Sequence, residues 1–291
     1  MSTTVDGGFR ELLTRLTPSN SESAAAIRHR ESVKACLESE FGMTAFFRTG
    51  SFGNGTSISG YSDVDYFAVI PADRLSNISS SSLSAVRDAL DRRFPRTGVR
   101  VSCPAVRVPF GVDGCESTEV VPAYLLSRSS SGYGVFGIAD CSGGWMRSSP
   151  EAHRAYVRDI DESLANKVRP LVRFMKAWKY YQDVPVSSFY LELCTAQYAS
   201  TQSSIVYALD VKCMFATLHR TRLADTQDPQ GISGSIRACS TEVKLRDAMS
   251  KVETALDRAQ RAVEADATGR TDDAFDWWGL LYNHKFPGYH R

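Results

Sequence analysis

The feature that most constrains this chain is a Gly-Ser pair, Gly50 and Ser51, followed by the acids Asp63 and Asp65 at the head of an apolar run. Alternate side chains of a β-strand share a face, so the two carboxylates project together. Neighbouring carboxylates repel each other unless a cation lies between them, and Mg²⁺ binds through one or two carboxylates plus substrate phosphates. Backbone N–H and hydroxyl groups of the preceding Gly/Ser/Thr-rich turn suit phosphate. The block therefore predicts a nucleoside triphosphate site.

Each part of this block also has a plainer explanation. An Asp-x-Asp pair can be a solvated strand start, and a Gly/Ser-rich loop can be only a loop. In this chain the turn, the spacing and the following strand agree with one another, which favours the site.

The block resembles the hallmark of the DNA polymerase beta nucleotidyltransferase superfamily, in which a third carboxylate follows on a later strand. Glu119, at the start of an apolar, β-prone run over 118–126, is the candidate for that third acid. The superfamily more often has Asp there, and the alternative for Glu119 is a charge at a strand entrance. The resemblance implies two Mg²⁺ (or Mn²⁺) ions per site, held by Asp63, Asp65 and Glu119.

Composition limits the classes of protein to consider. With 291 residues and 43% apolar side chains, the chain can form two domains or one bilobal unit. A net charge of +1 argues against a large nucleic-acid footprint. No apolar stretch is long enough to span a membrane, and the seven cysteines and five histidines are scattered. We therefore expect a cytoplasmic protein with reduced thiols, no structural zinc and no membrane segment.

The pattern of apolar residues predicts an α+β fold: a mixed sheet with helices over 1–140, a helical lobe over 141–291, and an active site in the cleft between them. The Gly/Ser-rich segment 127–145 marks the change, and the serine run 79–82 is expected to be a loop and N-cap. The expected elements are a helix over 21–40 capped by Ser21 or Ser23, strand-turn-strand over 44–70, strands over 99–108 and 118–126, a helix through 160–178 kinked at Pro170, and helices over 188–199, 205–222 and 243–263, with a docked apolar end at 274–282.

Three blocks in the second half, 144–153, 169–179 and 186–192, resemble the helical lobe of the cGAS/DncV-like nucleotidyltransferases (CD-NTases). Over roughly residues 20–230 this resemblance implies that Gly50 and Ser51 contact the donor triphosphate. It also implies that Lys176 and Ser188 hold its β- and γ-phosphates and that Phe189 stacks on the base. Each residue has an alternative: Lys176 as a core lysine whose ammonium reaches solvent, Ser188 as an N-cap, and Phe189 as ordinary core.

The same resemblance implies a bacterial antiphage enzyme that joins NTPs into a cyclic di- or trinucleotide, which acts on a separate effector. We expect no nucleic-acid activator, because the sequence has no Cys/His zinc insert and no long basic helix. An accessory regulatory protein is left open. The competing interpretations are a nucleotidyltransferase that modifies an RNA, a small molecule or a protein, and a nucleotide-binding module without catalysis.

Overall fold

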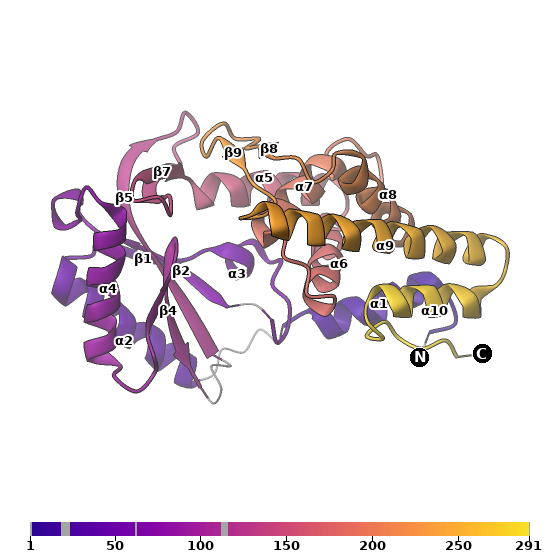
Figure 1. Cartoon of the computed structure of the whole chain (residues 1–291), viewed down its shortest axis with the longest axis horizontal. Helices are drawn as coiled ribbons and strands as arrows, with labels where there is room; N and C mark the ends of the chain where they lie inside the picture. Colours follow the sequence, from indigo (N-terminus) through magenta and orange to yellow (C-terminus); the bar gives the residue numbers. More distant parts are fainter. Residues whose placement is uncertain (1, 19–23, 62, 112–115, 291) are drawn as a thin grey trace.

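The computed structural model describes residues 2–18, 24–61, 63–111 and 116–290. They form a sheet lobe, in which two helices cover one face of a mixed sheet, and a helical lobe (Figure 1). Both chain ends lie at the far end of the helical lobe, where α1 and α10 pack together. The α+β class predicted from the apolar pattern is confirmed.

The sheet has seven strands in the order β1-β2-β5-β4-β3, and β6 and β7 continue along the far half of β5. Only β2 and β5 pair in parallel; the other described pairs are antiparallel. The strands are β1 Ala45–Arg48, β2 Val64–Val69, β3 Arg100–Ser102, β4 Ala105–Phe110, β5 Glu116–Arg128, β6 Gly134–Ala139 and β7 Trp145–Ser148.

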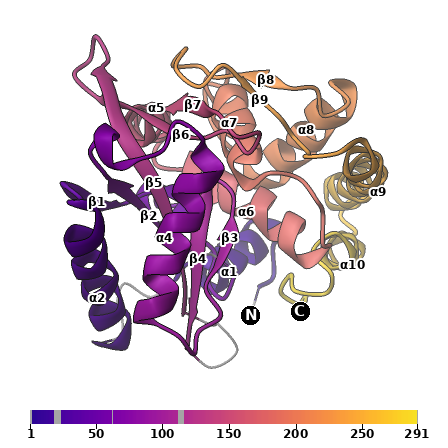
Figure 2. The same ribbon diagram turned by 60° about the vertical axis from the view of Figure 1, so that its left-hand side comes forward.

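The two faces of this sheet differ in what covers them. On one face Ala68, Val106 and Val120 join the apolar core under α2 (Ala24–Phe41) and α4 (Ser79–Arg93). Phe67 and Val121 point the opposite way, into a smaller cluster. Because strand side chains alternate, residues two positions before these share that second face, away from α2 and α4 (Figure 2). Asp65 and Glu119 occupy those positions.

The helical lobe is built around one apolar cluster that includes Phe9, Trp178, Phe215 and Trp278. Phe9 stands edge-on to both Phe174 and Trp278, so α1 belongs by packing to this lobe although it opens the chain. A two-stranded sheet, β8 and β9, completes the lobe. Its elements are α1 Val5–Leu16, α5 Pro150–Ser163, α6 Val168–Tyr181, α7 Ser188–Ala199, α8 Tyr207–Arg220, β8 Thr226–Gln227, β9 Ser235–Ile236, α9 Glu242–Ala267 and α10 Thr271–Leu281.

Several expected elements differ from the structure. The serine run 79–82 forms the first turn of α4 rather than a loop, and the side chains of Ser79 and Ser82 in this turn are buried. The helix expected through 160–178 is two helices, α5 and α6, and Pro170 lies in the first turn of α6, where its missing N–H is tolerated. The segment 127–145 contains β6 and the start of β7. The expected caps of the first long helix, Ser21 and Ser23, lie outside the described residues.

The expectation that every cysteine is a reduced thiol is wrong for one pair. Cys103 and Cys141 form a disulfide, with 5.7 Å between their Cα atoms. They are 38 residues apart in sequence, but β4 and β6 pair with the same edge of β5, so the turns at their adjoining ends meet. Cys36, Cys194, Cys213 and Cys239 are free thiols.

No helix within the described ranges is long and apolar enough to cross a membrane.

Candidate active site

The acids predicted from the sequence meet on one face of the sheet. The parallel register pairs Asp65 on β2 directly with Glu119 on β5. Asp63 precedes β2 by one residue and shares the parity of Asp65. We call these three carboxylates the acid row.

The Gly-Ser turn lies against the acid row, as the sequence motif predicts. Gly50 begins the short helix α3 (Gly50–Asn54) with φ +58, and a Cβ at this position would lie 1.9 Å from Asp65 Oδ2. Glycine is therefore required here both for its conformation and for the space. The backbone N–H of Ser51 donates to the Asp65 carboxylate, so the turn and the acid are in direct contact.

The acid row carries negative charge that its surroundings do not balance. Burial, followed by the charges of Glu119 and Asp63, raises the pKa of Asp65 to about 7, although Lys176 and the Ser51 N–H act in the opposite direction. Burial and the charge of Asp63 likewise raise the pKa of Glu119, against the opposing charges of Arg107 and Arg100. Such a cluster of carboxylates favours the binding of a cation.

Arg107, which the sequence reasoning missed, forms an ion pair with this row. Its Nη2 lies 3.0 Å from Asp63 Oδ1, and its Nε donates to Ser117 Oγ. Arg107 faces Glu119 across the β4–β5 pair. The sequence feature that could have identified Arg107 is its position as a single charged residue between Val106 and Val108 in an otherwise apolar strand.

The donor set fits a divalent metal ion: three carboxylates on adjoining strand positions, two of them with raised pKa values. Within the described ranges, however, no three acidic, histidine or cysteine side chains are already grouped to hold one. Asp63 is turned to Arg107 instead, so a metal ion would compete with that guanidinium for it.

Lys176, expected at the donor phosphates, lies in a buried joint between the lobes. Its side chain is 2% exposed and its Nζ donates to Glu192 on α7 and to Thr56 Oγ1. Glu192 also accepts from Asn54 Nδ2 and Thr56 Oγ1, both of the sheet lobe. These contacts outweigh burial and hold the pKa of Glu192 below its usual range. The charge of Lys176 still reaches Asp65, whose pKa it lowers.

Ser188 contacts Tyr180, and Tyr180 lies close enough to the acid row for the charges of the acids to act on it. The two hydroxyl oxygens are 3.2 Å apart, and besides burial the charges of all three acids raise the pKa of Tyr180. The cap of α7 is Ser187, whose side chain accepts from Tyr190 N–H, so Ser188 is not needed as a cap. Lys179, another residue that the sequence reasoning missed, is partly buried, and burial and Lys176 lower its pKa.

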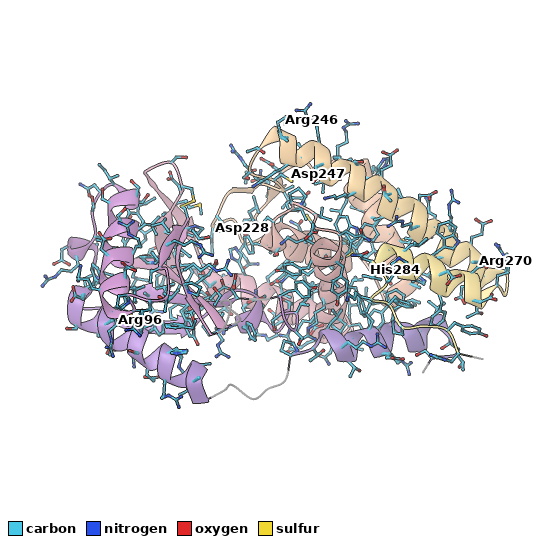
Figure 3. The ribbon with its side chains drawn as sticks, turned by 60° about the horizontal axis from the view of Figure 1, so that its bottom comes forward. Arg96, Asp228, Arg246, Asp247, Arg270 and His284 are labelled. Carbon is cyan, nitrogen blue, oxygen red and sulfur yellow. A yellow bond between two sulfur atoms is a disulfide. The ribbon has the colours of Figure 1, made fainter. Side chains whose placement is uncertain are left out.

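Phe189 is 38% exposed and meets the buried His153 edge-on, with ring centroids 5.1 Å apart. His153 Nε2 lies 3.0 Å from Asp228 Oδ2, and both side chains are buried. Burial alone would raise the pKa of Asp228; His153 and the N–H groups of Ser233 and Gln230 outweigh it and hold the pKa well below its usual range. Figure 3 shows Asp228 beside the boundary between the lobes.

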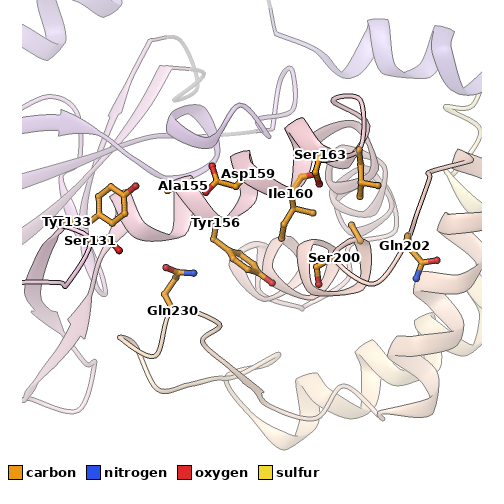
Figure 4. A pocket seen from close by; sticks show the side chains of 12 residues that line it. Ser131, Tyr133, Ala155, Tyr156, Asp159, Ile160, Ser163, Ser200, Gln202 and Gln230 are labelled. Atoms are coloured by element: carbon orange, nitrogen blue, oxygen red, sulfur yellow. The ribbon is translucent and has the colours of Figure 1, made fainter.

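A separate cavity of about 390 Å³ lies between α5, the end of α7 and the β8–β9 loop (Figure 4). Tyr156 and Asp159 of α5, Ser200 after α7 and Gln230 of the β8–β9 loop line it. None of the residues predicted for the site contributes to its lining, so this cavity is distinct from the acid row.

The fold and the acid row agree with the nucleotidyltransferase pattern predicted from the sequence, and comparison with known proteins gives the family. A family model for the Second Messenger Oligonucleotide or Dinucleotide Synthetase domain matches residues 1–160, which is more than half of the chain. The chain belongs to this family, a family of nucleotidyltransferases. A probable cyclic nucleotide synthase of Bacillus cereus (strain VD146) is 21% identical over 174 residues, 59% of this chain and 52% of that protein. The chain thus spans about half the length of this curated relative.

Solved CD-NTases share the fold over nearly the whole chain. CdnC of E. coli MS115-1 with ATP gives a TM-score of 0.74 at 17% identity, covering 99% of this chain and 100% of CdnC. A chain of the E. coli MS115-1 CdnC:HORMA-deltaN complex gives a TM-score of 0.72 at 16% identity, covering 97% of this chain and 98% of the matched chain. The DncV cyclic AMP-GMP synthase of Vibrio cholerae, with a linear intermediate, gives 0.66 at 15%, covering 98% and 86%. At such identities the likeness shows the fold alone.

Proposed function

We propose that this chain is a cyclic oligonucleotide synthase: it joins NTPs with release of pyrophosphate and closes the product into a cyclic di- or trinucleotide. The observation that carries the proposal is the contact between the Gly-Ser turn and an acid row whose charge is unbalanced. Family membership and the shared CD-NTase fold support it.

Two Mg²⁺ or Mn²⁺ ions, held by Asp63, Asp65 and Glu119, would lower the pKa of the acceptor hydroxyl and neutralise charge on the leaving pyrophosphate. The protein's part is to place the reactants. The Gly-Ser turn at Gly50 and Ser51 brings backbone N–H groups beside Asp65, where the donor phosphates would lie. No histidine base is needed, because positioning and electrostatic stabilisation dominate this chemistry.

The helical lobe would hold the donor from the other side. Lys176 and Ser188 stay proposed ligands of the β- and γ-phosphates, and Phe189, partly exposed, is proposed to stack on the donor base. Because Lys176 is ion-paired with Glu192, contact with phosphate requires that pair to loosen. Lys179 has no carboxylate partner among the described side chains, and we add it as a cation that can meet the phosphates directly.

The cellular role is proposed by the same analogy. A cyclic product would act on a separate effector in bacterial antiphage (CBASS) signalling, in the cytoplasm and without a nucleic-acid activator. The complex of CdnC with HORMA-deltaN supports an accessory regulatory protein as a partner. Reduced cysteines are typical of cytoplasmic proteins, and because Cys103 and Cys141 form a disulfide, this pair does not support a cytoplasmic location.

Product analysis tests the proposal. The full chain is incubated with all four NTPs and Mg²⁺ or Mn²⁺, treated with phosphatase, and examined by mass spectrometry beside an Asp63→Ala control. A phosphatase-resistant oligonucleotide present only with the unmodified chain is the expected result. NTP binding without release of pyrophosphate would instead identify a non-catalytic nucleotide-binding module.

A further inference from the structure

The sheet edge at β3 and β4, next to the acid row, contains a cavity of about 550 Å³. It lies where β4 runs on past the short strand β3, between the α4–β3 loop and α2. Its lining includes Arg96, Arg100 and Arg107 and no acidic side chain among the residues described. We call this cavity the arginine notch; Figure 3 labels Arg96, which lies in the sheet lobe.

Two of the three guanidinium groups are free to bind a ligand. Arg96 and Arg100 are exposed and make no ion pair or hydrogen bond within the part of the chain that the structure describes. Arg107 reaches from the notch to Asp63. Several like charges in a concave site focus a positive potential, and the planar guanidinium group matches phosphate oxygens in pairs. The notch is therefore suited to a polyphosphate.

The register of the sheet joins this notch to the acid row. Asp65 on β2 pairs with Glu119 on β5, Glu119 with Arg107 on β4, and Arg107 with Arg100 on β3. Directly opposed residues share a face, so four strands present two acids followed by two arginines. At about 4.8 Å between strands, the arginines lie roughly 5 and 10 Å from Glu119 along this line.

This spacing matches an acceptor nucleotide. Its reacting hydroxyl and its 5′-phosphates leave opposite sides of one ribose, so a nucleotide that lies along the row with its hydroxyl at Glu119 has its phosphates at Arg107 and Arg100. The donor triphosphate lies elsewhere in the proposed function, at the Gly-Ser turn and the helical lobe. Two polyphosphate groups would then flank the acid row without sharing cations.

We propose that the arginine notch binds the 5′-polyphosphate of the acceptor nucleotide, with Arg96 and Arg100 as its outer ligands and Arg107 as the inner one. The inference rests on the proposed function and deepens it, because it names the residues of this chain that would bind the 5′-phosphates of the acceptor NTP. Arg107 would also couple metal binding to acceptor binding, since it would leave Asp63 for the acceptor phosphate when the acid row binds metal.

Binding is tested first, without catalysis. Calorimetric titration with inorganic tripolyphosphate in EDTA compares the unmodified chain with the double variant Arg96→Gln/Arg100→Gln. The double variant Arg74→Gln/Arg147→Gln removes the same charge from exposed sites elsewhere and serves as control. We expect the notch variant to weaken, by at least about tenfold, a tripolyphosphate site that the control retains. Equal affinities in the two double variants would overturn the proposal.

Acceptor use is tested next, with 2′,3′-dideoxynucleoside triphosphates as donors because they cannot act as acceptors. The acceptors are the four ribonucleosides and, separately, their 5′-triphosphates. In the notch variant KM for triphosphate acceptors should rise at least about tenfold, with kcat and the nucleoside KM nearly unchanged. Equal losses with nucleosides and triphosphates would overturn the assignment, as would a notch that binds tripolyphosphate without changing acceptor preference, which is the behaviour of a site for free phosphate.

The two proposals fail in different ways. No product from the unmodified chain with any acceptor would overturn the proposed function and the acceptor assignment with it, while the tripolyphosphate titration still decides whether the notch binds phosphate. Product formation that is insensitive to the notch variant would leave the proposed function standing and overturn the notch.

Discussion

Two groups of charged side chains, one buried and one half-buried, lie close together in this molecule and differ in how they are balanced. At the joint between the lobes, Lys176 and Glu192 neutralise each other and Thr56 and Asn54 satisfy the remaining hydrogen bonds. In the acid row, Asp65 and Glu119 repel each other, Arg107 is paired with Asp63, and the charges of Lys176 and Arg100 offset only part of the repulsion. Removing one partner of a balanced buried pair destabilises the fold, whereas an unbalanced cluster itself costs stability and favours a ligand. The balance of charge therefore distinguishes the Lys176–Glu192 pair, which is structural, from the acid row, which we propose to be functional.

The largest expected effect is on activity. Asp65→Asn should reduce pyrophosphate release from NTPs by at least about a thousandfold, because a metal ligand at the reacting centre is lost. The free energy of unfolding should not fall, since one of three mutually repelling carboxylates is removed. Parallel activity and urea-unfolding measurements check both, with Asp73→Asn on the exposed turn Ala72–Arg74 as control. Loss of stability together with activity would make Asp65 a structural residue.

Glu192→Gln should have the opposite profile. Removing the carboxylate leaves the Lys176 ammonium buried and unpaired, which costs about 3–5 kcal/mol of unfolding free energy. Glu253→Gln, an exposed acid on α9, should change stability by less than about 0.5 kcal/mol. Chemical unfolding followed by circular dichroism measures the difference. If Glu192→Gln were as stable as the control, the joint between the lobes would not be a balanced pair.

Asp228 extends the comparison to pH. Its pKa is lower in the folded chain than in the unfolded one, so its stabilising contribution is complete above the usual Asp pKa of about 4 and is lost as the pH falls further. Asp228→Asn should cost about 2 kcal/mol at pH 7 and progressively less as the pH falls below about 4. Unfolding curves between pH 7 and 3 test this, beside the exposed control Asp225→Asn. A difference that stays constant down to pH 3 would contradict the assignment.

The smallest expected effects are on stability and activity at two adjacent serines, Ser187 and Ser188. Ser187→Ala removes the cap of α7 and should cost about 1 kcal/mol of stability with activity retained. Ser188→Ala leaves the cap intact and should lower kcat/KM for NTPs with little change in stability. Stability and steady-state kinetics of the two variants give the answer. Reversed profiles would remove Ser188 from the proposed donor site.

Local patterns were enough to predict part of this site. The alternation of Asp63 and Asp65 and the glycine before them depend on a few consecutive residues, and the structure places Gly50 against Asp65. Glu119 was identified as the candidate third acid through a family resemblance, and the register sets it beside Asp65. The α+β class and most long helices followed from apolar periodicity in the same way.

What could not be predicted depends on pairing between distant segments. Arg107 meets Asp63, and Cys103 meets Cys141, only because of how β4 and β6 are placed along β5. Glu192 stood in a block that resembled the family, but a single acid in an apolar helix does not identify Lys176 as its partner. The strands within 127–145 were hidden because Gly and Ser weaken the apolar alternation that identifies a strand.

The central claim is that the acid row is a cation site, and direct metal binding tests it best. Titration of the full chain with Mn²⁺, followed by electron paramagnetic resonance in the presence of non-hydrolysable NTP analogues, counts the bound ions. We predict two ions per chain for the unmodified protein and for Glu253→Gln, and loss of this binding in Asp65→Asn. Equal Mn²⁺ binding by the unmodified protein and Asp65→Asn would contradict the account.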